Sequence, residues 1–439
     1  MTLQGTTIHQ RLNKKAFVFQ FLADVHNTSI VFSATFIYIF RTLVTAQLPI
    51  WTLIQTVDRH FPRTTTSMGS LPSPPRPTTP PPSPELAPSR YRVYASFCLR
   101  EPSPNMNICN WIEFYNPSNN TWTSVTSIPG LIDNHVLKDF VMVSLGTSIY
   151  IIGGRLCRKQ KLHHSDYSND FIDEEIEVLS SVRRYDVLSN QWSMCTPLGV
   201  PRYNFACAVC ENKIYVAGGK SELASARGIC YAEVYDPTLD VWTPLPNMST
   251  LRYKCVGVTW QGKIHVVGGF VERGDSGWMS SMIERSSAEV YDTQAGRWDL
   301  IAGMWQLDVP PNQIVAVGDR LFSSGDCLKA WKGHIEAYDD KVNIWNVVDG
   351  SHLQTLNSPI STNDQNWTPI ERLYLTMVPI GAHLFFLAGY RMARESSRTM
   401  SRVQIFDTSA SSDAWRHFEP MEEEGEKELC SHCCVVLVS

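Results

Sequence analysis

Apolar and polar positions alternate in short runs from about residue 90 to the end of the chain. Residues 202–242 show the pattern most clearly: an apolar run at 205–210, a polar turn, and a second apolar run at 214–217 that ends in two glycines. A third run at 231–235 leads through another turn to a segment that contains Trp242. Short runs separated by turn residues predict a small four-stranded antiparallel sheet. A single sheet of this kind buries too little apolar surface to be stable alone in water.

The same pattern returns along the chain with an aromatic pair at a fixed place. In five copies a Tyr precedes a Trp by seven residues, and in the sixth a Phe precedes a Trp by nine residues because of a two-residue insertion. These pairs are Tyr115 and Trp122, Tyr185 and Trp192, Tyr235 and Trp242, Tyr291 and Trp298, Tyr338 and Trp345, and Phe406 and Trp415. Large rings at repeated positions are predicted to pack where adjacent sheets face one another, because each ring can bury roughly 150–250 Å².

Two further columns keep register with the aromatic pairs. A glycine doublet follows an apolar run at Gly153 and Gly154, Gly218 and Gly219, and Gly268 and Gly269; Asp326 and Ala388 replace one glycine in weaker copies. An arginine lies 17 residues before the second doublet position at Arg202, Arg252 and Arg372. Glycine at a strand end permits a positive φ and a close approach of neighbouring backbones. The glycine doublets are therefore interpreted as structural.

Repeats of about 50 residues with a diglycine, a Tyr and a Trp resemble the kelch family, and this resemblance implies a β-propeller. We expect residues 91–439 to form an all-β, six-bladed kelch propeller. The first blade is expected to combine residues 93–122 with the apolar run 429–438, so that the two ends of the domain pair in one sheet and close the ring. The other five blades are predicted at about 137–194, 202–247, 252–304, 309–350 and 371–420.

The first 90 residues differ from the repeats. Residues 1–60 are apolar with a few basic residues, and residues 61–90 are rich in proline, which predicts a disordered, extended linker. Residues 27–57 carry Arg41 as their single charge, which divides them into charge-free runs shorter than the roughly 20 residues that a membrane span needs. A membrane anchor is therefore not expected, although this segment is the one place where it remains an alternative.

Composition limits the classes of partner and the cellular compartment that suit the chain. The net charge of −5 argues against a nucleic-acid surface over the whole molecule, and twelve cysteines without the spacing of a small disulfide framework suit a reducing compartment. A cytoplasmic or nuclear location is expected.

Candidate metal ligands are interpreted as structural, and no metal or other cofactor is expected. The pairs Cys207 and Cys210, and Cys430 and Cys433, have CxxC spacing, but residues three apart in a strand point to opposite faces. His163, His164 and Asp166 lie in a segment that is basic and then acidic, interpreted as a flexible polar loop. The acidic run 422–428 is interpreted as a solvated turn. A metal-dependent oxidase or lyase, which the related galactose oxidase fold would allow, remains the enzymatic alternative.

Strand geometry predicts one functional face. Each repeat's Arg begins a first strand and the doublet ends the second, and in an antiparallel pair these two ends lie at the same edge. We therefore expect the arginines and the residues after the doublets to share a face that binds a protein partner with an acidic motif, because Arg forks match carboxylates. The predicted partner-binding residues are Arg155, Arg202, Lys220, Arg252, Phe270, Arg372, Tyr390 and Arg391.

The alternative is that each Arg only bonds the carbonyl groups of neighbouring loops. If the face binds a partner through its arginines, charge reversal at Arg202 and Arg252 is expected to abolish partner capture and to leave the melting temperature almost unchanged. The kelch resemblance implies a non-catalytic interaction module, with substrate recruitment for ubiquitin ligation as one setting. Many kelch proteins carry an F-box or BTB domain for that purpose, and residues 1–90 show no helical pattern similar to either, so a free-standing scaffold is the other setting.

Overall fold

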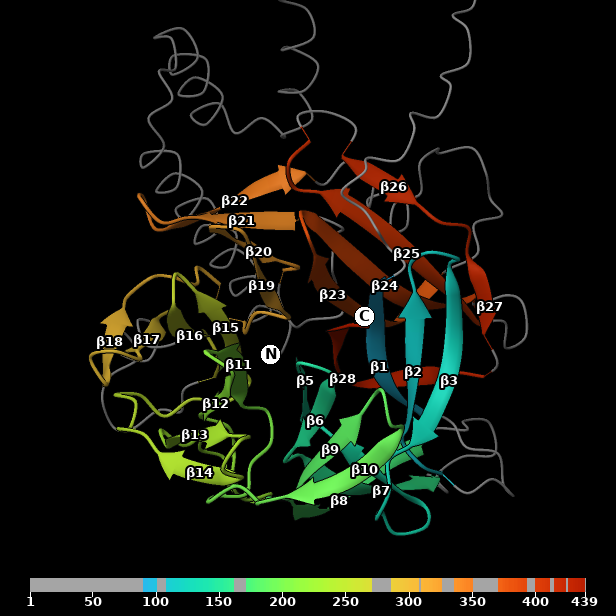
Figure 1. The fold of residues 1–439 in the computed structure, drawn as a ribbon, viewed down its shortest axis with the longest axis horizontal. Coiled ribbons are helices and arrows are strands. Elements are labelled where there is room, and N and C mark those ends of the chain that lie inside the picture. The colour runs from blue at the N-terminus through green and yellow to red at the C-terminus, as the bar shows by residue number, and fades with distance from the viewer. Residues whose placement is uncertain are drawn as a thin grey trace, which may run out of the picture. The chain divides into compact units, whose positions relative to one another are not determined.

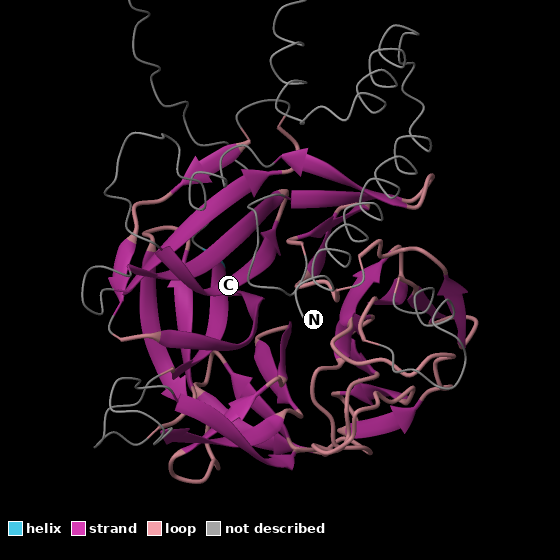
Figure 2. Ribbon diagram, turned by 180° about the vertical axis from the view of Figure 1, so that it is seen from behind, coloured by secondary structure: helices cyan, strands magenta, loops and turns pink. Residues whose placement is uncertain are grey.

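The computed structural model describes residues 90–100, 108–161, 171–270, 286–307, 309–325, 335–349, 370–392, 399–410, 414–423 and 425–438. All of them belong to the second of two compact units, which spans residues 81–439. Residues 1–60 and nearly all of the proline-rich linker lie outside the described part. Within that part the regular elements are strands, with no α-helix (Figure 2). The all-β fold class that the repeats predict is therefore confirmed.

Five sheets repeat one antiparallel pattern in chain order, and the predicted repeat boundaries agree with them to within a few residues. The first four are built from β5 (Val141–Leu145), β6 (Ser148–Ile152), β9 (Val182–Asp186) and β10 (Gln191–Cys195); β11 (Ala206–Cys210), β12 (Lys213–Ala217), β13 (Ala232–Asp236) and β14 (Val241–Pro244); β15 (Val256–Trp260), β16 (Lys263–Val267), β17 (Ala288–Asp292) and β18 (Arg297–Ile301); and β19 (Ile314–Val317), β20 (Arg320–Ser323), β21 (Ile335–Asp339) and β22 (Ile344–Asp349). The fifth contains β23 (Ile370–Ile380), β24 (His383–Met392), β25 (Thr399–Asp407), β26 (Trp415–His417) and β27 (Met421–Glu423).

A sixth sheet joins the two ends of the described chain in the order β28-β1-β2-β3. Its strands are β1 (Tyr91–Leu99), β2 (Trp111–Asn116), β3 (Thr121–Ser127) and β28 (Lys427–Leu437). The register of β1 against β28 begins at Tyr91 opposite Leu437 and ends at Leu99 opposite Lys427. The expected pairing between the start and the end of the repeat region is therefore present.

The first strand of each repeat, together with β28, faces the centre of the arrangement (Figure 1). These strands touch in sequence, because β28 contacts β5, β5 contacts β11, β11 contacts β15, β15 contacts β19, β19 contacts β23, and β23 contacts β28. The hydrophobic core is accordingly divided into clusters between neighbouring sheets, such as the one that joins Ile152 and Val182 to Phe205 and Val216.

The aromatic pairs occupy matching positions in all six sheets. Each pair lies directly opposite in register on the last two main strands, as Tyr235 does with Trp242, and the ring centroids are 5.0–5.5 Å apart. The Tyr rings and Phe406 are buried, whereas four of the six tryptophans are half-buried. Most of the outer rings are therefore less buried than the repeat pattern predicts.

The tryptophans also connect neighbouring sheets through their indole nitrogens. Nε1 of Trp242 donates to the Thr196 carbonyl oxygen at 2.9 Å, and Nε1 of Trp298 donates to the Pro246 carbonyl oxygen at 2.7 Å. In both cases the acceptor lies just after the outer strand of the preceding sheet. Trp242 and Trp298 therefore each contribute a directional bond between sheets in addition to packing.

The structure of the segment between β6 and β9 differs from its interpretation as a flexible polar loop. Its basic and acidic halves form the hairpin of β7 (Arg155–Lys161) and β8 (Phe171–Val178), and β7 also pairs with β4 (His135–Lys138) in a separate three-stranded sheet. Arg158 lies opposite Glu174 in this hairpin, so charges of the basic half are paired with charges of the acidic half across the two strands.

Candidate functional site

The candidate site lies where the first strand of a repeat begins and the second ends. Tyr203 and Lys220 exchange two backbone hydrogen bonds of 3.0 Å each, and Tyr253 and Phe270 exchange bonds of 3.2 and 2.8 Å. Gly219 permits this approach, because its φ is +95° and an added Cβ would lie 2.8 Å from the Tyr203 carbonyl oxygen. The shared edge that strand geometry predicts is therefore present in two successive repeats.

Side chains from three successive sheets contact one another along this edge. The Arg155 guanidinium lies 5.3 Å from the Tyr203 ring centroid, and Nζ of Lys220 lies 4.3 Å from the Tyr253 ring centroid. The Tyr253 ring in turn lies 5.4 Å from that of Phe270. We call these five residues the cation–aromatic band. Each cation–π contact joins a cation of one sheet to a ring of the next, so the band also links sheets.

The two cations of the band have different electrostatic surroundings. Nε of Arg155 lies 2.6 Å from Oδ2 of Asp139, and its guanidinium also contacts Glu175. Burial lowers the pKa of Arg155, but these acidic surroundings, Asp139 above all, raise it overall. Lys220 has no carboxylate within ion-pair distance among the described residues, and its side chain is partly exposed. Lys220 is thus the cation of the band that remains available to an acidic partner.

Arg202 and Arg252 do not form part of an exposed surface, which corrects their predicted placement. Both are 0% exposed. Nη1 of Arg202 donates to the carbonyl oxygens of Gly218 and Tyr231 at 3.1 and 3.0 Å, and Nη1 of Arg252 donates to that of Gly268 at 2.8 Å. Burial lowers the pKa of Arg202, although the neighbouring Glu233 opposes this effect. The alternative in which each Arg bonds neighbouring carbonyl groups describes both residues.

A column of buried glutamates completes these arginine sites and was missed in the sequence. Nη2 of Arg202 lies 2.9 Å from Oε1 of Glu233, and Nη2 of Arg252 lies 3.5 Å from Oε1 of Glu289. Each glutamate stands two residues before the repeated Tyr, in the identical segments AEVYD of β13 and β17. A charged residue recurring inside a buried strand was the available signal, because such residues are seldom buried without a partner.

The other predicted partner residues lie on β23 and β24, on different strands from the band. Arg372 lies opposite Tyr390 in register, and burial raises the pKa of Tyr390 to about 12 while Arg372 opposes the shift. Arg391 is ion-paired, with Nη1 2.8 Å from Oε1 of Glu426. These three residues are partly exposed.

The acidic run 422–428 is not a solvated turn. The side chain of Glu423 is 3% exposed, and its Oε1 accepts a hydrogen bond of 2.9 Å from the Tyr374 hydroxyl. Burial raises the pKa of Glu423, although Lys427 opposes the shift. Glu428 lies 2.8 Å from Nζ of Lys138. Glu423 and Glu428 therefore connect β27 and β28 to neighbouring strands.

Metal-binding geometry is not found among the described residues, where no group of three or more His, Cys, Asp or Glu side chains could hold an ion. Cys207 and Cys210 pack in different clusters, as do Cys430 and Cys433, as the strand geometry predicts. His163, His164 and Asp166 lie outside the described residues. No helix among the described residues is long and apolar enough for a membrane span.

Comparison with known proteins identifies the repeat. The family model described as the kelch motif matches residues 201–249. An F-box/kelch-repeat protein of Arabidopsis thaliana is 30% identical over 52% of this chain and 55% of its own length, and a second one is 31% identical over 40% and 43%. The human Kelch repeat and BTB domain-containing protein 12 is 28% identical over 37% of this chain and 26% of its own length. The chain thus matches about half or less of each relative.

Proposed function

We propose that this chain, which belongs to the kelch-repeat family, is a non-catalytic module that binds a protein partner through the cation–aromatic band. The six sheets are, in this proposal, the blades of a closed propeller. The unbroken series of contacts among the innermost strands and the pairing of β28 with β1 support closure. A closed ring suits recognition, because it fixes loops from several sheets on one rigid face.

The observation that carries the proposal is the contact of Lys220 with the Tyr253 ring, which in turn packs against the Phe270 ring. The ammonium group of Lys220 stacks on Tyr253, and Phe270 extends the same apolar surface. Aromatic and cationic side chains fixed by packing lose little conformational entropy when a partner binds, which makes them effective anchors. Because Lys220 has no carboxylate partner among the described residues, the partner is expected to present an acidic motif.

The setting that we propose is substrate recruitment for ubiquitin ligation in the cytoplasm or nucleus. The F-box and BTB domains in the names of the relatives support this setting, because such domains connect kelch proteins to ligases. The net charge of −5 supports a protein partner over nucleic acid. The eleven cysteines of the described residues are free thiols, which supports a reducing compartment.

Affinity purification with quantitative mass spectrometry tests the proposal. The full chain is compared with a Lys220→Glu, Phe270→Ala double variant, which reverses the unpaired charge and removes the adjacent ring. We expect the double variant to lose its principal partners at least roughly tenfold, since one hydrogen-bonded charge pair is commonly worth that factor. Its melting temperature should stay close to that of the wild type, because both side chains are partly exposed.

Lys341→Glu is the matched control, because Lys341 is exposed in the turn between β21 and β22, outside the band. Partners retained by the control and lost by the double variant support the band as the site. Ligase subunits among the proteins that copurify would support recruitment, and their absence beside retained partners would favour a scaffold. Equal capture by the double variant and the wild type would show that the band is not the site.

A further inference from the structure

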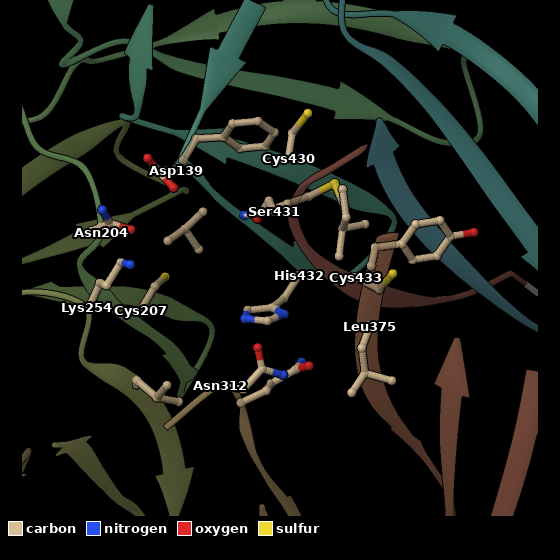
Figure 3. Close-up of a pocket in the computed structure, with 18 of the residues that line it drawn as sticks. Asp139, Asn204, Cys207, Lys254, Asn312, Leu375, Cys430, Ser431, His432 and Cys433 are labelled. Carbon is tan, nitrogen blue, oxygen red and sulfur yellow. Dashed lines mark hydrogen bonds between the residues drawn. The ribbon is translucent and has the colours of Figure 1, made fainter. Parts of the chain in front are cut away.

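The outer edge of β22 is open. This strand pairs with β21 on one side, and no strand of the described residues pairs with its other side. Figure 1 shows β22 at the rim of its sheet, at the opposite end from β19. The inner edges of the sheets are covered, because the innermost strands contact one another around a cavity of about 580 Å³ (Figure 3). The outer edge of β22 can therefore accept a further strand.

Exposed apolar side chains are concentrated on β22. Ile344, Val347 and Val348 are all exposed, and Val347 is 64% exposed. The outermost strands of the other five repeated sheets, β3, β10, β14, β18 and β26, each contain at most one exposed large apolar residue. A local group of exposed apolar residues is typical of a surface that associates with another molecule.

β22 also lacks the residues that usually protect an open edge. Charged side chains and proline discourage the addition of a strand. β18 carries Arg297, β26 carries Arg416, and β14 ends in Pro244. The sequence of β22, IWNVVD, has its single charged residue, Asp349, at the last position. β3 and β10 are uncharged too, but they have no group of exposed apolar residues, so β22 alone among these outermost strands combines both features.

The order of residues in β22 is complementary to itself. In an antiparallel pairing with a second copy that is centred on Asn346, Ile344 lies opposite Val348, and Trp345 lies opposite Val347. Apolar positions then face apolar positions, and Asn346 faces its own equivalent, where the two amide groups can hydrogen-bond. A bulge in β22 comes after Val347, so the centre of this register lies in a regularly paired part of the strand.

We propose that two copies of this chain associate edge to edge through β22, antiparallel and centred on Asn346, so that their two sheets become one continuous sheet. A twofold axis at Asn346 makes every other contact occur twice, which suits a self-complementary strand. The interface covers one strand and a few side chains, so we expect reversible association with a dissociation constant in the micromolar range. The cation–aromatic band lies on other sheets, so this dimer does not depend on the proposed protein partner.

Sedimentation equilibrium of the full chain under reducing conditions tests the proposal, at roughly 1 to 100 µM so that the expected constant is bracketed. We expect a reversible equilibrium of monomer and dimer. Val347→Lys should weaken the dimer at least roughly tenfold, because each copy would place an unpaired charge against apolar residues. Met194→Lys is the matched control and should dimerise like the wild type. Met194 is also 64% exposed and also lies two residues after the repeated Trp, on β10.

A cysteine substitution tests the register. In Asn346→Cys the two introduced thiols lie on strands whose opposite Cα atoms are about 4.5–5.5 Å apart, a separation that suits a disulfide. Mild oxidation with diamide should therefore give a covalent dimer on a non-reducing gel, and dithiothreitol should reverse it. Thr243→Cys, at the equivalent exposed position of β14, should remain a monomer, as should the wild type. This test also stands if Val347→Lys fails to fold.

Three outcomes would overturn the proposal. The first is a wild type that stays monomeric over the whole concentration range. The second is a dimer that is equally stable in folded Val347→Lys, which would place the contact on another surface. The third is equal cross-linking of Asn346→Cys and Thr243→Cys, because collisions in solution would then explain both.

Discussion

Nη2 of Arg202 lies 2.9 Å from Oε1 of Glu233, and neither side chain is accessible to solvent. Oε2 of the same glutamate accepts a hydrogen bond of 3.0 Å from the amide of Gly199, which belongs to the chain segment that enters the sheet. The backbone of Arg202 also reaches the preceding sheet, where its carbonyl oxygen accepts a bond of 2.8 Å from the amide of Gly154. The pair therefore fixes both the start of a sheet and its junction with the previous one.

Truncation of this pair should strongly destabilise the protein. Arg202→Met leaves the Glu233 carboxylate buried without its cation, and breaking a buried pair in this way costs about 3–5 kcal/mol. Chemical denaturation should show this loss in the free energy of unfolding. Arg297→Met, in the exposed arginine of β18, is the control and should change stability by less than about 1 kcal/mol. An Arg202 variant as stable as the control would show that the pair is not essential to the fold.

The same burial changes the meaning of the charge-reversal experiment at Arg202 and Arg252. Two new carboxylates would face Glu233 and Glu289 in a space from which water is excluded, so the double variant should fail to fold. A loss of partner capture in that variant would report unfolding and not a lost contact. We expect a large fall in melting temperature, measured by circular dichroism, in place of the unchanged value that the sequence suggested.

The repeated Tyr offers a matched pair of substitutions. The Tyr235 hydroxyl donates to Oδ1 of Asp240 at 2.6 Å, whereas the position equivalent to Asp240 in the sheet of Tyr291 is Gly296, which has no side chain to accept. Tyr235→Phe should therefore lower the free energy of unfolding, and Tyr291→Phe should lower it much less. Urea unfolding of the two variants measures the difference. Equal losses would mean that ring packing alone gives this column its role.

The repeat pattern was sufficient to predict the six repeated sheets, but not the three-stranded sheet of β4, β7 and β8. Period-two alternation, turn residues and the fixed spacing of Tyr235 and Trp242 are local, and they determine which residues pair across neighbouring strands. The pairing of β1 with β28 also followed, because the first repeat lacked a strand and the last residues supplied an apolar one. Interactions within a repeat, and the pairing between the two ends of the repeat region, could therefore be predicted from the sequence.

The candidate site was predicted less well, because depth below the surface is not a local property. Strand direction placed Arg202 and Lys220 at the same edge, and both are there. Whether an edge residue is covered depends on its partner across the sheet: Glu233 holds Arg202 inside, whereas Lys220 is held outside by the ring of Tyr253 from the next sheet. The role of Tyr253 was missed, although Tyr203 and Tyr253 each directly follow a repeated Arg and this recurrence was the available signal.

Buried histidines should make the protein sensitive to acid. His265 is buried beside Trp260, with ring centroids 5.2 Å apart, and burial lowers its pKa from 6.5 to about 4. Between these values the unfolded chain binds a proton that the folded chain does not, so stability falls as the pH falls from 6.5 to 4. The shift corresponds to about 3 kcal/mol.

The free energies of unfolding of the wild type and His265→Phe, measured at pH 7 and at pH 4, check this dependence. The Phe variant should lose about 3 kcal/mol less than the wild type across this interval, because its ring binds no proton. Parallel losses in the two proteins would show that His265 contributes nothing to acid sensitivity.

The three-stranded sheet should depend on a charge cluster that it shares with the last strand. Nζ of Lys159, on β7, lies 3.2 Å from Oε2 of Glu428 on β28 and 3.4 Å from Oδ1 of Asp173 on β8, and its side chain is 3% exposed. Burial alone would raise the pKa of Glu428, but Lys138 and Lys159 lower it overall. The stabilisation from this carboxylate is therefore present above its unfolded pKa of about 4.5 and is lost as the pH falls through the lower folded value.

In Glu428→Gln, Lys138 and Lys159 are still largely shielded from solvent and retain Asp173 as their remaining carboxylate partner in this cluster. We expect a loss of about 1–3 kcal/mol at pH 7, less than for a fully buried pair because the Glu428 side chain is 35% exposed. Hydrogen exchange should quicken in β7 and β8 before it quickens in β11 to β14, since the cluster joins only the first of these regions to β28. Glu177→Gln, on the exposed side of β8, is the matched control. Uniform quickening across both regions would mean that Glu428 supports the whole fold, and unchanged exchange in β7 and β8 would mean that the cluster does not hold the three-stranded sheet.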